Sequence, residues 1–194
     1  MAKKSNKVYQ LKVMLKGSKP PIWRRFLVED SMRLSALHAA LQVIMGWSDS
    51  HLYQFKTGHH CYGDPHPEYG FDEDEMLEAR KYRLNQFLVN EKDSIIYEYD
   101  FGDGWEHKIT LEKILPRDPD LFLPICVKGK GACPPEDVGG IWGYYDFLKA
   151  VQDKDHPEHE DMTEWVGYDY DPAHFDLAGT NGMLAENFHA DYRP

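Results

Sequence analysis

The feature that most constrains the fold is a run of alternating apolar and polar residues on both sides of a short glycine-containing turn. Residues 95–101 and 105–113 show this alternation, in which every second side chain is apolar. Alternation with period two is typical of a strand that buries one face, and the intervening turn residues favour a β-hairpin. The sequence therefore predicts a sheet built around an antiparallel pair.

Two registers of this hairpin are possible, and they imply different chemistry. A turn at residues 103–104 would place Asp100 opposite His107 as an acid–base or ligand pair. A loop at residues 102–104 would instead pair Tyr99 with His107 and make one face wholly apolar or aromatic. We favour the second register, because a one-residue slip would turn every buried side chain toward solvent.

In the favoured register His107 lies on the buried face beside Tyr99 and Trp105, Asp103 lies at the loop tip, and Asp100 points away. His107 is then either a hydrogen-bonded core histidine or a ligand of a bound molecule or metal. Likewise, Asp103 either bonds its own turn backbone or contributes to a site.

A second segment with functional character is residues 133–140, which combine two prolines, two carboxylates and two glycines before a predicted helix. Glu136 and Asp137 could complement the positive end of the helix dipole, or they could belong to a binding site. We expect this helix entrance to meet the hairpin tip and to form one site with it.

The remaining pattern predicts strands, short helices and tight turns along one domain, residues 1–194, with residues 1–7 as a frayed tail. The predicted strands are 8–15, 22–28, 52–57 and an edge strand at 124–127. The predicted helices are 34–45, closed by Gly46, then 84–89, 141–151 and a short one after Pro172. Residues 58–70 are predicted to form a loop, and 72–78 a solvated turn. This order favours an α+β fold with a mainly antiparallel or mixed, roll-like sheet and helices packed on one side.

Composition limits the partners and the compartment. The chain has a formal net charge of −11, and its basic residues are scattered along the sequence, which disfavours nonspecific nucleic-acid binding. No apolar run approaches the ~20 residues of a membrane-spanning helix, and no secretory signal follows the basic start. Three cysteines favour free thiols in a reducing compartment. We expect a cytoplasmic protein with no membrane partner.

A divalent metal, in particular zinc, is a possible cofactor. Cys126 and Cys133 are seven positions apart, which is wider than the usual zinc knuckle, and His107 or Asp137 could complete the ligand set. The neighbouring Lys128 and Lys130 would stabilise thiolates. The alternative is that both cysteines are small, partly buried packing residues.

Two further residues are candidates for the same site. His51 precedes a predicted strand, where polar groups often line a cleft. Arg24 and Arg25 point to opposite faces of their strand, so at most one of them can serve the site.

Several of these segments, taken in order, resemble the plasmid pRiA4b ORF-3-like family. The matching segments are residues 21–25, 34–38, 46–47 with 51–52, 99–103 with Trp105 and His107, and 134–140. The resemblance implies an α+β roll in a prokaryotic protein of plasmid or mobile-element type. Some family members carry a resolvase-type label, but this chain shows neither a basic DNA-binding segment nor a serine-recombinase motif. The family often has a cysteine where this chain has Val138, and this difference weakens a cysteine-rich metal site.

The sequence thus favours a binding or interaction module that recognises a protein or small-molecule ligand. The candidate cleft comprises Arg24, His51, Asp103, Trp105, His107, Glu136 and Asp137. One alternative is a metal-dependent, hydrolase-like enzyme with Glu136 as general base and an ion held by Asp103, His107, Cys126 or Cys133. Another is a DNA-associated accessory protein of mobile elements.

Overall fold

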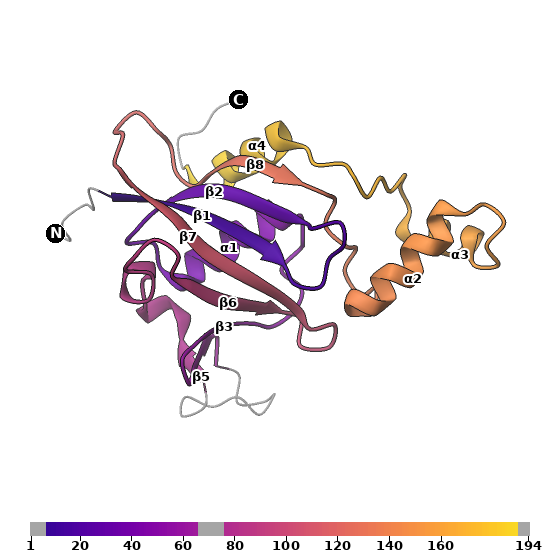
Figure 1. The fold of residues 1–194 in the computed structure, drawn as a ribbon, viewed down its shortest axis with the longest axis horizontal. Helices are drawn as coiled ribbons and strands as arrows, with labels where there is room; N and C mark the ends of the chain where they lie inside the picture. The colour runs from indigo at the N-terminus through magenta and orange to yellow at the C-terminus, as the bar shows by residue number, and fades with distance from the viewer. Residues whose placement is uncertain (1–6, 66–75, 190–194) are drawn as a thin grey trace.

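The eight strands of the structure form one mixed sheet that is not closed into a barrel (Figure 1). The computed structural model describes residues 7–65 and 76–189. The strand order is β5-β4-β3-β6-β7-β1-β2-β8, and every neighbouring pair is antiparallel except the pair of β4 and β5. The strands are β1 Lys7–Leu15, β2 Trp23–Glu29, β3 Tyr53–Thr57, β4 His60–Gly63, β5 Met76–Glu78, β6 Ser94–Tyr99, β7 Trp105–Pro116 and β8 Ile125–Lys130.

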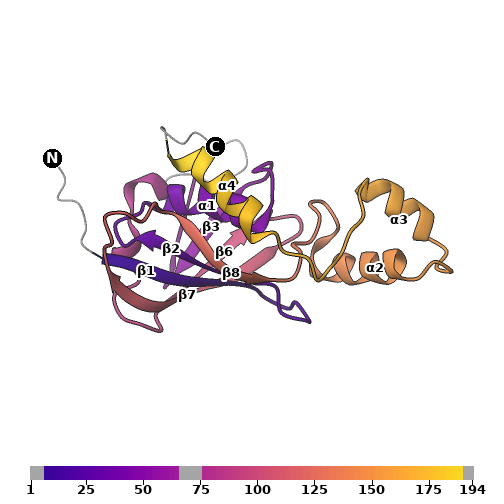
Figure 2. The same cartoon turned by 90° about the horizontal axis from the view of Figure 1, so that it is seen from above.

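Four α-helices accompany the sheet in the described ranges and confirm the α+β class. They are α1 Leu34–Met45, α2 Gly140–Gln152, α3 His159–Val166 and α4 Leu177–Phe188, with short 3-10 helices η2 Ala79–Lys81 and η3 Leu84–Gln86. Figure 2 shows α1 and α4 stacked over one face of the sheet, while α2 and α3 stand beyond its end. The helices of the described residues include none with the length and apolarity needed to cross a membrane.

Helix α1 forms the centre of the core, because its apolar residues recur at helical spacing. Leu34, Leu37, Leu41 and Ile44 are at most 1% exposed and pack against the sheet. The helix ends at Gly46, which takes the left-handed conformation with φ of 91° and donates its N–H to the Gln42 carbonyl. This is the predicted termination by a residue without a side chain.

The hairpin of β6 and β7 buries the predicted face, but its register matches neither prediction. Tyr99 pairs with Trp105, Tyr97 with His107 and Ile95 with Ile109, so the connecting loop spans residues 100–104. This register differs from the favoured one by two positions, so the apolar face is unchanged.

The longer loop is closed by Asp100, and its predicted outward orientation is wrong. Asp100 adopts φ of 57°, its carbonyl accepts the Gly104 N–H, and its Oδ1 accepts the Gly102 N–H at 2.9 Å. Asp100 is only 7% exposed and lies in the loop, not on the polar face opposite Glu106. Its carboxylate therefore becomes available to groups beside the hairpin tip.

Other differences concern short or exposed elements. The predicted loop at 58–70 contains strand β4, and residues 66–70 of it lie outside the described residues. Of the predicted turn at 72–78, residues 72–75 lie outside the described residues and the rest is strand β5. The predicted tail at 1–7 also lies outside them, except for Lys7, which begins β1. Helix α3 was not predicted, and none of its residues is buried.

Helix α4 covers the edge strand β8 with a specific pair of hydrogen bonds. The Asn181 side chain accepts the Cys126 N–H at 2.8 Å and donates to the Cys126 carbonyl at 2.9 Å. The amide of Asn181 thus satisfies both backbone groups of one edge residue, as a neighbouring strand would.

Candidate functional site

The hairpin tip and the entrance of α2 meet, as expected from the sequence. Asp103 Oδ2 accepts the Gly139 N–H at 3.2 Å. Gly140 has φ of 67° and lies so close to the tip that an added Cβ would be 2.4 Å from the Asp103 carbonyl oxygen. Glycine is required there because the two backbones touch.

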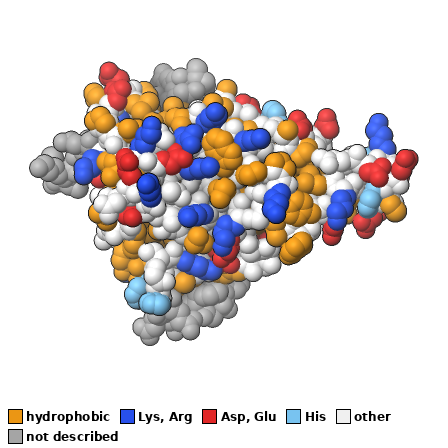
Figure 3. Space-filling view, in the orientation of Figure 1, with side chains coloured by type: hydrophobic (Ala, Val, Ile, Leu, Met, Phe, Trp, Pro, Cys, Tyr) orange, Lys and Arg blue, Asp and Glu red, His pale blue; other side chains and the backbone are white. Residues whose placement is uncertain are grey.

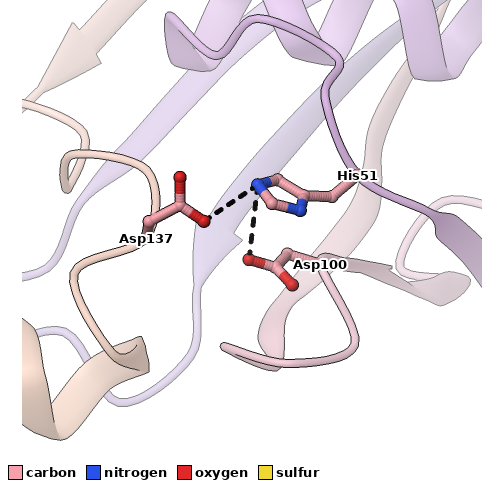
Figure 4. Close-up of side chains that lie close together, drawn as sticks. All are labelled: His51, Asp100 and Asp137. Atoms are coloured by element: carbon pink, nitrogen blue, oxygen red, sulfur yellow. Dashed lines mark ion pairs between the residues drawn. The ribbon is translucent and has the colours of Figure 1, made fainter.

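Three side chains from separate loops converge beside this contact (Figure 4). His51 comes from the connection between α1 and β3, Asp100 from the hairpin loop, and Asp137 from the segment before α2. The His51 Nε2 lies 3.2 Å from Asp137 Oδ1 and 3.8 Å from Asp100 Oδ2. The side chains of His51, Asp100 and Asp137 are 27%, 10% and 71% exposed, so the cluster opens to solvent on the Asp137 side.

The geometry of the cluster fits a shared cation better than direct hydrogen bonds. His51 Nε2 is shielded from solvent and has no hydrogen-bond partner, despite the two carboxylates near it. Ligands of zinc lie ~2.1 Å from the ion, so two ligands at angles of roughly 100–130° lie about 3.2–3.8 Å apart. His51, Asp100 and Asp137 are also the one group of three or more potential ligand residues found within the described ranges.

Both carboxylates of the cluster sit on unusual backbone. Asp100 and Asp137 have φ of 57° and 59°, a left-handed conformation that non-glycine residues seldom adopt. Such strain persists only where surrounding contacts hold it, and it concentrates at functional positions. For Asp100 these contacts are the loop N–H groups on Oδ1, which leave Oδ2 facing His51.

Glu136, the neighbour of Asp137, holds the segment before α2 in place through hydrogen bonds. Its Oε1 accepts the Tyr99 hydroxyl at 2.6 Å, and its Oε2 accepts the Ser48 hydroxyl at 2.5 Å and the Ser48 N–H at 3.2 Å. Burial raises the pKa of Glu136, but the hydrogen bonds from Ser48 and Tyr99 outweigh it and hold the pKa below its usual value. Glu136 therefore stays ionised with both oxygens occupied. It ties the helix entrance to the hairpin and to the end of α1.

A cleft of about 680 Å³ is lined in part by Glu136. It runs between the end of α1, the segment before α2 and the chain that leads into α4, and its wall includes Trp47, Pro135, Trp165 and Phe175. Its size is that of a small-molecule site. Glu136, which precedes Asp137 of the cluster in the chain, also lines this cleft.

His107 and Trp105 do not belong to this site. His107 is fully buried, with the rings of Trp47 and Tyr97 centred 5.2 and 5.5 Å away. Burial lowers the pKa of His107 to about 4. Neither ring nitrogen has a hydrogen-bond partner. The structure therefore places His107 in the core, among aromatic rings and outside the cluster of His51, Asp100 and Asp137.

Arg24 lines the cleft described above and also joins three elements of the fold. Its guanidinium donates to the carbonyls of Ile44, Trp23 and Lys130 at 2.9–3.2 Å and stacks on Phe175, 3.9 Å from the ring centre. Arg24 is 2% exposed, because the chain before α4 covers it. Arg24 thus connects α1, β8 and the segment before α4.

The cysteine-based metal site is not formed. Cys126 is buried, and its thiol donates to the carbonyls of Arg25 and Lys128. Burial raises the pKa of Cys126 to about 11 and also raises that of Cys133, so the predicted activation by lysines is wrong. Lys128 lies across from Arg25 in the register of β2 and β8, so its side chain projects from the face of the sheet opposite to that of Cys126.

Of the predicted candidates, the structure brings together His51, Asp103, Glu136 and Asp137. Asp100 and Tyr99 complete the site. Sequence reasoning did not assign Tyr99 to it, and it considered Asp100 as a ligand only in the register that was not favoured. The signal for Asp100 was an aspartate two residues before a glycine at a strand end, where its side chain can accept the glycine N–H.

Comparison with known proteins identifies the family. Residues 7–179 match the profile described as plasmid pRiA4b ORF-3-like protein. The chain belongs to this family. It is 42% identical over 168 residues to the uncharacterized protein y4hQ of Sinorhizobium fredii (strain NBRC 101917 / NGR234), which covers 86% of this chain and 84% of y4hQ.

A solved structure has the same fold as this family member. The crystal structure of MM3350 from Methanosarcina mazei Go1, a protein of unknown function, matches with a TM-score of 0.79 and 40% sequence identity. The match covers 88% of this chain and 96% of MM3350.

Proposed function

We propose that this protein is a binding module that takes one divalent cation of the zinc class at His51, Asp100 and Asp137. The observation that carries the proposal is the His51 Nε2, which is shielded from water, lacks a hydrogen bond, and lies 3.2 and 3.8 Å from two carboxylate oxygens. One imidazole and two carboxylates leave open coordination positions on the ion. A protein or small-molecule ligand would occupy these positions from the exposed Asp137 side.

The charges of the site support a cation. Two carboxylates face one imidazole there, so a divalent ion would balance them, whereas an anion would be repelled. Asp100 is already held in place by the N–H groups of its own loop, so little order is lost when the ion binds. Asp137, with a side chain that is 71% exposed, is the ligand that adjusts.

Binding is favoured over hydrolysis because the expected general base is committed elsewhere. A general base needs a free lone pair within reach of the attacking water. Glu136 accepts hydrogen bonds on both oxygens and has a lowered pKa. These properties fit a residue that holds segments together and do not fit a proton acceptor.

The test measures zinc and manganese binding by isothermal titration calorimetry on metal-stripped protein, with the parent compared to the His51→Ala and Asp137→Asn variants. The matched control is Asp146→Asn, which removes an exposed carboxylate that pairs with Lys149 in α2. We expect one ion per chain, an affinity at least about tenfold lower in both site variants, and no change in the control. Equal affinity in the parent and in Asp137→Asn would refute the site. Turnover of activated esters by the metal-loaded protein would favour the hydrolase-like alternative.

A further inference from the structure

The face of the sheet opposite α1 carries an organised set of cations. Cross-strand partners point to the same face, so the register defines rows of side chains across the strands. One row crosses six strands from β8 to β3 and consists of Lys130, Trp23, Met14, Lys108, Ile96 and Lys56. The adjacent row consists of Lys128, Arg25, Lys12 and Thr110. We refer to these two rows as the basic face.

The basic face lies on the outer side of the sheet. The residues between its members along the strands, such as Arg24, Phe26, Val13 and Ile109, are buried under α1 and α4. Figure 3 views the molecule from this side and shows Lys and Arg side chains gathered over the middle of the sheet. No described helix covers them (Figures 1 and 2).

The local charge is opposite in sign to that of the whole chain, which is −11. Four glutamates share this side of the sheet and are already paired: Glu106 with Lys16, Glu98 with Lys56, Glu112 with Arg25, and Glu29 with Arg117. Among the described residues, Lys12, Lys108, Lys128 and Lys130 form no ion pair, and the last three are exposed. The gathering of these lysines on one face of the sheet could not be recognised from the sequence, where they are far apart.

An aromatic ring lies within this charged surface. Trp23 is half-buried, with the Lys12 ammonium 5.0 Å and the Arg25 guanidinium 5.3 Å from the ring centre. Both cations lie over the ring, so a base that stacks on the indole would take their place while they turn to pair with phosphates.

We propose that the basic face binds single-stranded nucleic acid. The six-strand row spans about 24 Å at ~4.8 Å between strands, long enough for a short extended strand. A duplex would hide its base faces from Trp23, whereas a single strand exposes them. This proposal is independent of the cation site at His51, because none of its residues belongs to that site.

The experiment is fluorescence anisotropy with labelled oligothymidylate and oligouridylate of about 20 nucleotides. The test variant is Lys108→Glu/Lys130→Glu. The matched control is Lys149→Glu/Lys154→Glu, which changes net charge equally but on α2 and the turn after it. We expect at least about tenfold weaker binding in the test variant, and a control within about twofold of the parent.

Two further readouts test the mechanism. Four unpaired lysines predict that log K falls with log salt at a slope of about −3, since each phosphate contact contributes roughly −0.7 on single strands. Trp23→Leu should weaken binding about tenfold while leaving the salt slope unchanged, because it removes stacking and no charge. Circular dichroism of each variant checks that the fold is intact.

The following results would overturn the proposal. Equal loss in the test and control variants would mean that net charge alone acts. Binding to a duplex of the same length as tightly as to the single strand would exclude base stacking. Tighter binding to vesicles that contain phosphatidylserine than to either oligonucleotide would assign the face to a membrane surface.

Discussion

The buried His107 gives the sharpest test of how the structure assigns the core and the site. We consider the substitution His107→Phe, which keeps a planar ring between Trp47 and Tyr97 and removes two nitrogens that have no hydrogen-bond partner. Unpaired polar atoms in a core are costly, so the variant should be at least as stable as the parent at pH 7.

The pH dependence supplies the magnitude. The pKa of His107 is about 4 in the folded protein, below its ordinary value of 6.5, because burial disfavours the charged ring. Between pH 6.5 and pH 4, His107 is therefore protonated in the unfolded chain but neutral in the folded protein. The free energy of unfolding falls as the pH drops through this range. At about 1.4 kcal/mol per pH unit the full loss is about 3 kcal/mol, of which about 2 kcal/mol develops between pH 7 and pH 5.

The assay is urea unfolding followed by fluorescence at pH 7, 6 and 5, for the parent, His107→Phe and the exposed-site control His60→Phe. Other groups titrate in all three proteins, so the informative quantity is the difference between variant and parent. This difference should grow by about 2 kcal/mol in favour of His107→Phe between pH 7 and pH 5, and it should stay constant for His60→Phe. A constant difference for His107→Phe, or loss of cation binding in that variant, would refute the assignment of His107 to the core.

Two further predictions concern the helix entrance and the thiols. Gly140→Ala should lower the free energy of unfolding by about 2 kcal/mol and weaken cation binding, because its Cβ would press on the Asp103 carbonyl; Gly182→Ala, in open space on α4, should stabilise by up to about 1 kcal/mol, and chemical denaturation with calorimetry distinguishes the two. In thiol labelling at pH 8, Cys61 should react before the buried Cys126, whose pKa of about 11 leaves little thiolate; faster modification of Cys126, located by peptide mapping, would contradict the burial described for it.

Local sequence pattern predicted the elements that bury a regular face. The alternation at 95–113 identified which hairpin residues enter the core, and the spacing of Leu34, Leu37 and Leu41 identified α1. The hairpin register was not predictable, because it depends on the left-handed Asp100 and on the hydrogen bonds that its side chain accepts. Helix α3 has only eight residues, and its apolar Met162 and Val166 are partly buried, so its apolar stripe is too short to stand out in the sequence.

The contact between the hairpin tip and the entrance of α2 could be predicted from the sequence, but the residues that form the cluster could not. Asp103 and Asp137 were assigned to the site because carboxylates beside glycines stand out in a sequence. His107 lies in the core and Arg24 in the wall of the cleft, and neither position was predictable, since burial depends on tertiary packing and a polar side chain can serve the core. The distance between His51 and Asp100 is set by two connections that are remote in the chain.

The single amide of Asn181 has a consequence for association between molecules. With both backbone groups of Cys126 engaged by this side chain, β8 cannot extend the sheet into a neighbouring copy at that position. The Asn181 carboxamide thus prevents a further strand from pairing with β8 at Cys126. Its replacement by leucine would leave the N–H and carbonyl of Cys126 without a partner at the edge of the sheet.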